Sequence, residues 1–517
     1  MPLLDVAKLS VTLDGATAVT DASFSVERGQ RVAIIGESGA GKSILARALS
    51  GLLPPGAAVS GSAFFDGQQL FEDESRLAAL RAGKLGALLE TDRDALDPLL
   101  TGIQHLQGVI TAHDDTLRQR DVQAWLARVG LDPARARLFP EQLSPAERQS
   151  LVVALALARE PELLIADNPA RGLDLIDQHR VFDLIEQICR EREMALLLIS
   201  PDIKAIAMLA EKVLVLHQGR IVEAGSKTDV FGHPKHDYTR RVLSAGRLRQ
   251  RTLMRTPIGE ALLTARAVGR KGRGRGNALF ALEGVSFEMR TGESLALFGT
   301  GGAGKSLLGR IVAGLERATA GSLEFDARIY RGTDLSPINR GDIGYVFRQA
   351  LTAFDPKLAV GLSIAEPLRL DVDRGIDDPD IRVRDTVAAL GLSPDLLTAL
   401  PPELTDAQLQ RFAIARALIT RPKLVVLDEP VLDLDIGERS AFLILLDRLR
   451  ADFGLSLLIA TRDFDTVRVL ADRVLVMDRG HVVETGTPAQ LAAAPQHPVT
   501  QRLIAALLPE IGIVPIF

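Results

Sequence analysis

Residues 36–43 read "GESGAGKS", and the segments on either side of this octapeptide decide the fold. The run before it, "RVAII" at 31–35, is apolar and β-branched, whereas "ILARALSGLL" at 44–53 has the spacing of an amphipathic helix. The same order returns at 299–306, where "GTGGAGKS" stands between "SLALF" and "LLGRIVAGL". A glycine-rich loop between a strand and a helix, present twice, predicts an α/β fold.

Other landmarks also occur twice, at a nearly constant interval. The interval is 263 residues from Lys42 to Lys305, 260 from "GSAFFDG" at 61 to "GSLEFDA" at 321, and 261 from "VLVLHQGRIVEAG" at 213 to "VLVMDRGHVVETG" at 474. A single hydrophobic core stops growing at roughly 250 to 300 residues, so a chain of 517 residues predicts two domains. We expect one domain over 1–245, an arginine-rich linker over 246–262 and a second domain over 263–517.

The composition argues against several classes of protein. A formal net charge of -5 disfavours attraction to nucleic acid or anionic lipid, and the basic run "RKGRGRGN" at 270–277 is typical of a solvated linker. The single cysteine, Cys189, excludes an intramolecular disulfide and fits a reducing cytoplasm. The N-terminal "MPLLDVAKLSV" lacks a signal-peptide pattern, and no apolar run approaches the ~18 residues that span a bilayer. We therefore expect no direct membrane insertion.

The octapeptides fit the pattern G-x-x-x-x-G-K-[ST], in which backbone N–H groups surround an anion and the next helix presents its positive end to it. The lysine of each loop would reach the β and γ phosphates of a nucleotide, and the serine after it would ligate Mg²⁺. An acidic residue at the end of a nearby apolar strand, as in "LLIAD" and "LVVLD", can hold the Mg²⁺ shell opposite that serine. The expected nucleotide-binding residues of the loops are Gly36, Glu37, Ser38, Gly39, Ala40, Gly41, Lys42, Ser43, Gly299, Thr300, Gly301, Gly302, Ala303, Gly304, Lys305 and Ser306, and the expected metal ligands are Ser43, Asp167, Ser306 and Asp428.

With these motifs the chain resembles a fused pair of ATP-binding cassette ATPases over nearly its whole length. The segment "GRIVEAGSKTDVFGHPKHDYTRRVLSA" at 219–245 is similar to the tail of the ATPase subunits of oligopeptide, dipeptide and nickel importers, and "GHVVETGTPAQLAAAPQHPVTQRLIAALLP" from 480 is a weaker version. His233 and His236 in this tail could be metal ligands, although two histidines on a proline-containing loop are more often only exposed.

The resemblance implies two tandem P-loop domains, each with a mainly parallel sheet and a helical subdomain, and ATP and Mg²⁺ as cofactors. It implies two membrane permease subunits as partners and a solute-binding protein as an indirect partner. The protein would then lie in the cytoplasm, on the inner face of the cell membrane.

Both signature segments depart from the family pattern. In the family, each ATP lies between the glycine loop of one domain and a signature, usually "LSGGQ", of the other. The resemblance places the signatures at "LSPAERQ" from Leu143 and "LTDAQLQR" from Leu404, so that Ser144 and Thr405 would contact nucleotide. Ser-x-x-Glu and Thr-x-x-Gln are capping boxes, which predict that a helix begins after each residue. Glu147 and Asp406 would bring carboxylates toward a triphosphate and weaken its binding.

The other family positions differ between the two copies. The family glutamine that contacts Mg²⁺ and water aligns with Glu90 and Arg348, and the switch histidine aligns with Pro201 and Arg462. Arginine at these positions could still bind a γ-phosphate. The residue after the Mg²⁺-holding aspartate, normally a glutamate that polarises the attacking water, is Asn168 in "LLIADNPARGLD" and Glu429 in "LVVLDEPVLDLD". An amide cannot accept a proton, so we expect any hydrolysis at Glu429 and an inactive first site.

Three functions fit these observations unequally. The tail and the phrases "LDPLL" and "FDPKL", which resemble permease-contacting segments, favour the energy-coupling ATPase of an importer. The altered signatures favour a nucleotide-binding regulatory or structural module with little or no hydrolysis. A ribosome-associated tandem cassette predicts intact signatures and no importer tail, contrary to this sequence. The cargo is a peptide only by resemblance, and nickel, opines and glycosides remain open.

Overall fold

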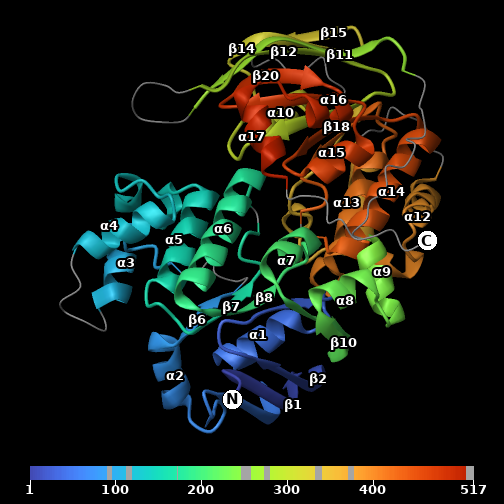
Figure 1. Cartoon of the computed structure of the whole chain (residues 1–517). Coiled ribbons are helices and arrows are strands. Elements are labelled where there is room, and N and C mark those ends of the chain that lie inside the picture. The colour runs from blue at the N-terminus through green and yellow to red at the C-terminus, as the bar shows by residue number, and fades with distance from the viewer. Residues whose placement is uncertain are drawn as a thin grey trace. The chain divides into compact units, whose positions relative to one another are not determined.

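The computed structural model describes residues 1–89, 96–111, 119–171, 173–245, 258–272, 280–331, 341–370, 378–432 and 434–507. The chain forms two compact units, one built on Met1–Arg247 and the other on Leu248–Leu434 and Glu438–Leu507 (Figure 1). The predicted linker at 246–262 lies outside the described residues up to 257, and its last two residues belong to strand β11 (Ala261–Lys271). The exact domain limits stay a prediction.

Each unit contains a six-stranded sheet in which the described strands pair in parallel, except for the antiparallel pair β9 and β10 in the first unit and β19 and β20 in the second. From the antiparallel edge, the strand order is β10-β9-β3-β8-β7-β6 in the first unit and β20-β19-β13-β18-β17-β16 in the second, so the two sheets have the same topology. The strands of the first sheet are β3 (Arg31–Ile35), β6 (Leu85–Leu88), β7 (Leu163–Asp167), β8 (Ala195–Ile199), β9 (Lys212–His217) and β10 (Arg220–Ser226). Those of the second are β13 (Ser294–Gly299), β16 (Ile343–Val346), β17 (Leu424–Asp428), β18 (Ser456–Thr461), β19 (Arg473–Asp478) and β20 (His481–Gly486).

A smaller antiparallel sheet accompanies each large one. Its order is β2-β1-β4-β5 in the first unit and β12-β11-β14-β15 in the second. The strands are β1 (Leu4–Leu13), β2 (Ala16–Val26), β4 (Ala58–Phe65), β5 (Gln68–Gln69), β11, β12 (Phe280–Arg290), β14 (Ala320–Phe325) and β15 (Arg328–Arg331).

Helices surround both large sheets. In the first unit they are α1 (Lys42–Ser50), α2 (Glu74–Gly83), α3 (Gly102–Thr111), α4 (Gln119–Arg128), α5 (Pro145–Leu157), α6 (Leu175–Arg192), α7 (Ile203–Leu209), α8 (Lys227–Gly232) and α9 (Asp237–Ala245). In the second they are α10 (Lys305–Val312), α11 (Val360–Leu370), α12 (Pro379–Ala389), α13 (Asp406–Leu418), α14 (Ile436–Phe453), α15 (Phe464–Leu470), α16 (Pro488–Ala493) and α17 (Pro498–Ala505). None of the described helices is both long enough and apolar enough to span a bilayer.

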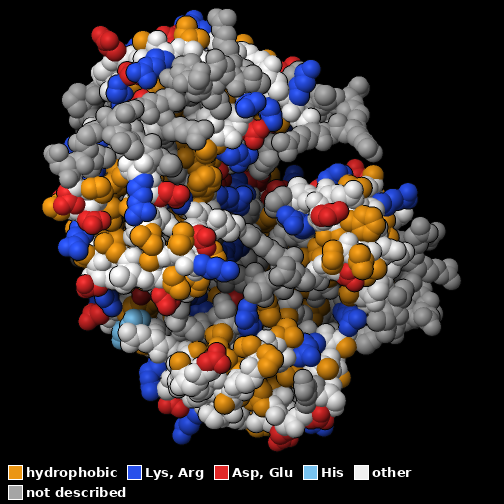
Figure 2. Space-filling view, turned by 180° about the vertical axis from the view of Figure 1, so that it is seen from behind, with side chains coloured by type: hydrophobic (Ala, Val, Ile, Leu, Met, Phe, Trp, Pro, Cys, Tyr) orange, Lys and Arg blue, Asp and Glu red, His pale blue; other side chains and the backbone are white. Residues whose placement is uncertain are grey.

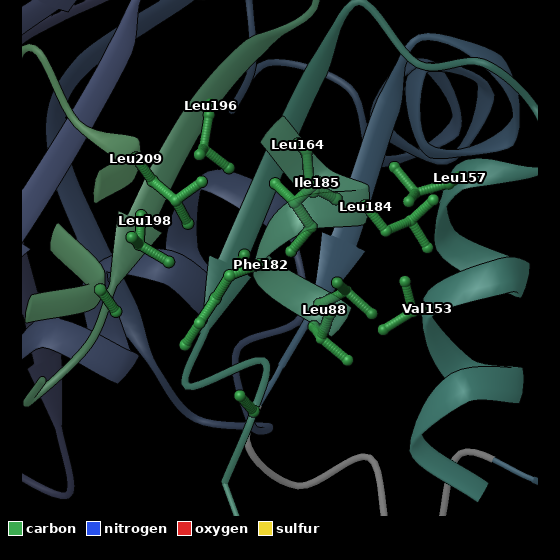
Figure 3. Close-up of a cluster of buried hydrophobic side chains, with 14 of the residues drawn as sticks. Leu88, Val153, Leu157, Leu164, Phe182, Leu184, Ile185, Leu196, Leu198 and Leu209 are labelled. Carbon is green, nitrogen blue, oxygen red and sulfur yellow. The ribbon is translucent and has the colours of Figure 1, made fainter. Parts of the chain in front are cut away.

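The central strands are apolar throughout because both faces of the sheet are covered. Side chains alternate along a strand, so Leu163 and Ile165 of β7 join the core that contains α1 and the antiparallel sheet. Leu164 and Ala166 join the opposite core, which contains α5 and α6. Figure 3 shows side chains of α5 and α6 meeting those of β7 and β8 in that core. Burying one such leucine or isoleucine contributes about 1.5 to 3 kcal/mol, so this layered packing fixes the sheet firmly.

The parallel strands place the predicted motifs at one edge of each sheet. The glycine loop follows β3, Asp167 ends β7, and Ser200 and Pro201 follow β8. The carboxyl ends of neighbouring parallel strands form the usual ligand-binding edge of an α/β sheet. The predicted α/β fold, the strands at "RVAII", "SLALF", "LLIAD" and "LVVLD" and the helices after the glycine loops are therefore confirmed.

Candidate functional site

The two glycine loops keep the first turn of the following helix open for an anion. Gly41 and Gly304 precede α1 and α10 with φ of 99° and 96°, in the left-handed region, and no side chain caps either helix. A Cβ at Gly41 would lie 2.4 Å from the carbonyl oxygen of Ala18, so glycine is required there. The uncapped N–H groups and the helix dipole suit a phosphate group.

The loop lysines are folded over the loops that they belong to. Lys42 Nζ donates hydrogen bonds to the carbonyl oxygens of Gly36 and Glu37, at 2.8 and 2.7 Å. Lys305 Nζ donates to those of Gly299 and Thr300, both at 2.8 Å. Burial lowers the pKa of Lys42, whereas the nearby carboxylate of Asp167 acts in the opposite direction. The structure thus holds the ammonium group of each lysine against the backbone of its own glycine loop.

The second unit joins the predicted metal ligands directly. Ser306 Oγ donates a hydrogen bond to Asp428 Oδ1 at 2.6 Å, and the Tyr345 hydroxyl donates to Asp428 Oδ2 at 3.0 Å. Burial, and then the charge of Asp428, raise the pKa of Tyr345, so the phenol keeps its proton. The sequence did not single out Tyr345, although "IGYV" against "LGAL" was a visible difference between the two copies.

In the first unit the corresponding aspartate has fewer partners. Asp167 is only 2% exposed and is hydrogen-bonded by Ser43, but its Oδ1 atom has no hydrogen-bond partner among the described residues. Burial raises the pKa of Asp167. Ala87 stands where the second unit has Tyr345, because Leu85 pairs with Leu163 as Ile343 pairs with Leu424.

These aspartate and serine oxygens fit Mg²⁺, which prefers carboxylate and hydroxyl oxygens together with phosphates. The buried, unpartnered Oδ1 of Asp167 is a natural ligand atom, because a buried carboxylate oxygen is stabilised by a cation.

Asn168 and Glu429 have nearly the same φ angle and make the corresponding backbone hydrogen bond. Their φ angles are 51° and 49°, and each N–H donates to a strand carbonyl at 2.8 Å, from Asn168 to Ile199 and from Glu429 to Ala460. Asparagine tolerates this left-handed region better than most residues. The side chains of the two copies therefore start from the same point, and the chemical difference lies in what they meet.

Glu429 meets three donors from the end of β18. Its Oε1 accepts a hydrogen bond from Arg462 Nε at 2.8 Å. Its Oε2 accepts from the backbone N–H of Arg462 at 3.2 Å and from Thr461 Oγ1 at 3.4 Å. In the first unit Pro201 has no N–H group to offer, and Asn168 Oδ1 has no hydrogen-bond partner in the part of the chain that the structure describes. The structure therefore brings two predicted site residues, Glu429 and Arg462, into one ion pair.

The signature residues are helix caps, as predicted. Ser144 Oγ accepts from the N–H of Glu147 at 3.2 Å, and the Glu147 carboxylate accepts from the N–H of Ser144 at 2.7 Å. Thr405 and Gln408 make the same reciprocal pair at the start of α13, at 3.3 and 2.9 Å. The ion pair with Arg135, at 2.6 Å, lowers the pKa of Glu147 to about 2. Arg135 thus balances the negative charge that the sequence led us to expect at Glu147.

Glu90 and Arg348, the two positions aligned with the family glutamine, have fewer described contacts around them. Glu90 lies outside the described residues. Arg348 is half-buried, two residues after β16, so it stands next to the strand that carries Tyr345.

The importer-like tail is tied to the first glycine loop. The Tyr238 hydroxyl of α9 accepts a hydrogen bond from the N–H of Glu37 at 2.7 Å, and its ring stacks on His217 with centroids 3.8 Å apart. His236 Nδ1 accepts from the N–H of Tyr238, while Glu223 accepts from the N–H groups of Lys235 and His236. His236 thus has a capping role, and the described residues contain no group of three or more His, Cys, Asp or Glu side chains that could hold a metal ion.

Charged side chains on the face seen in Figure 2 are mixed in sign. Lysines and arginines lie among acidic and apolar side chains and do not form one continuous basic stripe. The expectation that nucleic acid is not a partner stays a prediction.

Known proteins resemble this chain along almost its full length. The family model described as ABC transporter matches residues 19–171 and 282–432. The glutathione import ATP-binding protein GsiA of Pectobacterium atrosepticum is 33% identical over 566 residues, covering 98% of this chain and 89% of that protein. The peptidoglycan transport ATP-binding protein YejF of Agrobacterium fabrum is 32% identical over 538 residues, covering 98% and 96%. A solved dimer of the ATP-binding cassette MJ0796 with ADP and Pi aligns at 25% identity and a TM-score of 0.41, over 44% of this chain and 99% of that one.

Proposed function

Because this chain belongs to the ABC transporter family and carries two of its ATPase domains in tandem, we propose that it is the energy-coupling subunit of an importer. The relatives named for glutathione import and peptidoglycan transport support a peptide or related small solute as cargo. The proposed partners are two membrane permease subunits and, through them, a solute-binding protein. With these partners, the chain would lie in the cytoplasm at the inner face of the membrane.

We propose that both glycine loops bind ATP with Mg²⁺. Lys42 and Lys305 would bind the β and γ phosphates, while Ser43 with Asp167 and Ser306 with Asp428 would hold the metal. Mg²⁺, when bound, would neutralise charge on the phosphates. The contacts of Ser144, Thr405 and Arg348 with nucleotide, and the pairing of each loop with the other domain's signature, stay predictions.

We propose that hydrolysis is confined to the second domain. The observation that carries this assignment is that Glu429 and Asn168 have nearly the same φ angle, while only Glu429 can accept a proton. Its role would be to orient and deprotonate the attacking water next to Asp428 and Ser306.

Calorimetry and phosphate release test this assignment. A non-hydrolysable ATP analogue should bind with a stoichiometry of about two, one per loop, and Lys42→Ala should lower it. Glu429→Gln should reduce turnover by about 10²- to 10⁴-fold, as the loss of a positioned base does. The matched change Asn168→Gln should alter turnover little. Unchanged phosphate release by Glu429→Gln would exclude Glu429 as the base.

A second candidate function is a nucleotide-binding module with little hydrolysis. It is favoured by the ion pair that already occupies Glu429. Phosphate release measured with the permeases present separates the two functions, because a coupled ATPase should be stimulated by them.

A further inference from the structure

The ion pair between Arg462 and Glu429 is nearly enclosed. The two side chains are 12% and 8% exposed, and Arg462 Nε lies 2.8 Å from Glu429 Oε1. Parallel pairing of β17 with β18, with Asp428 opposite Ala460, sets both residues at the same edge of the sheet. The contact therefore follows from the strand register.

Both oxygens of the proposed base are in use in this arrangement. Oε1 accepts from the guanidinium, and Oε2 accepts from two uncharged donors, Thr461 Oγ1 and the Arg462 N–H. A general base must have an oxygen within hydrogen-bond reach of the proton that it takes. While Arg462 Nε is bound to Oε1, both carboxylate oxygens are occupied by donors of the protein. The ion pair therefore blocks the oxygen that the proposed base would present to the attacking water.

The uncharged donors let Glu429 keep its place without Arg462. The backbone N–H at 462 and the Thr461 hydroxyl contact Oε2 alone, so Oε1 becomes available when the guanidinium leaves. Arginine carries five donors in a planar fork and binds phosphate oxygens in bidentate fashion, so the γ-phosphate of a bound nucleotide would offer the guanidinium a second anionic partner.

We infer that Arg462 is a latch on Glu429: it holds the carboxylate until the γ-phosphate of ATP takes the guanidinium, so nucleotide binding itself releases the base. Glu429 Oε1 then takes a proton from the water whose oxygen bonds to the γ-phosphorus, as the bond to the ADP oxygen breaks and that oxygen keeps the electron pair. The inference rests on the proposed function of the second domain. The first domain has no latch, since Pro201 and Asn168 carry no charge.

A double-mutant cycle on nucleotide affinity tests the latch without relying on turnover. Titration calorimetry would compare the whole chain, Glu429→Gln, Arg462→Met and the double variant, each with Mg²⁺ and either a non-hydrolysable ATP analogue or ADP. The second site is identified as the one lost in Lys305→Ala. Glu429→Gln should free Arg462 and tighten the ATP analogue at that site about tenfold, a common size for coupled charged pairs. ADP, which lacks the γ-phosphate, should bind unchanged.

The gain in affinity for the ATP analogue that Glu429→Gln causes should vanish in the Arg462→Met background. If removing the carboxylate merely relieved repulsion of the phosphates, the gain would be as large or larger in Arg462→Met, and the latch would be excluded. An equal gain with ADP would exclude it too. If Arg462→Met fails to fold because Glu429 is left buried, Arg462→Lys supplies the cycle, and its ammonium group, which lacks the planar fork of a guanidinium, should shrink the gain. If the second site binds nucleotide but the cycle shows no such coupling, only the latch is overturned. If Lys305→Ala removes no nucleotide binding, the proposed function is overturned as well.

Discussion

At the residue scale, the two domains differ in the contacts around Asp167 and Asp428, the proposed Mg²⁺ ligands. Asp428 has two hydroxyl donors, Ser306 and Tyr345, whereas Asp167 has an unpartnered oxygen and an alanine in place of the tyrosine. An uncharged donor on one oxygen limits how the carboxylate can rotate. The two sites should therefore hold Mg²⁺ with different geometry.

Tyr345→Phe should weaken Mg²⁺-nucleotide binding at the second site. The variant removes one hydrogen bond to a carboxylate, which corresponds to about a 3- to 30-fold loss of affinity. Calorimetry with Mg²⁺ and a non-hydrolysable ATP analogue measures it. The matched control is Tyr330→Phe, which removes a buried hydroxyl that donates to the Val312 carbonyl instead. Equal effects of both variants would show that Tyr345 acts only on stability.

Restoring a glutamate at position 168 should not restore the first site. In the second unit the glutamate is held by Thr461 and by the N–H of Arg462, and Pro201 cannot supply the equivalent N–H. Phosphate release by Asn168→Glu in a Glu429→Gln background should stay within about threefold of that background, because a base that is not positioned contributes little. Recovery of the wild-type rate would show that position 168 alone silences the first domain.

At the element scale, sequence reasoning succeeded where a local pattern decides the structure. Apolar runs such as "LLIAD" became strands, and the four-residue caps at Ser144 and Thr405 formed as predicted. The antiparallel sheets were not predicted, because strands such as β1 are partly exposed and carry no motif. Contacts that depend on strand register were also missed. Arg462 reaches Glu429 across 33 residues and Tyr345 reaches Asp428 across 83, which no local pattern encodes.

The start of α5 should lose stability in acid through Glu147. Its pKa is lowered to about 2 by Arg135, against an ordinary value of 4.5, so its contribution is complete above about pH 4.5 and is lost as the pH falls toward 2. Glu147→Gln should therefore be less stable than the parent chain at pH 7, and the deficit should shrink below pH 4.5. Urea unfolding at several pH values measures this. Glu141→Gln, which removes an exposed carboxylate nearby, is the matched control.

At the scale of the whole molecule, the proposed partners should decide where the chain is found. Expressed with two cognate permease subunits, it should sediment with membranes and be released by alkaline carbonate, as expected of a subunit attached through protein contacts. Expressed alone, it should stay in the supernatant after membrane fractionation. Carbonate-resistant pelleting of the chain alone would contradict the proposed mode of attachment.

The hydrogen bond between Tyr238 and the first glycine loop limits where the first domain can be truncated. A fragment ending after β10, at Ser226, would retain every motif of the first ATPase domain, so its motifs alone would suggest a complete domain. It would lack α9, so the Glu37 N–H would lose its acceptor and the His217 ring its stacking partner. Split-protein complementation or crystallisation of that half should therefore use a fragment that extends through Ala245.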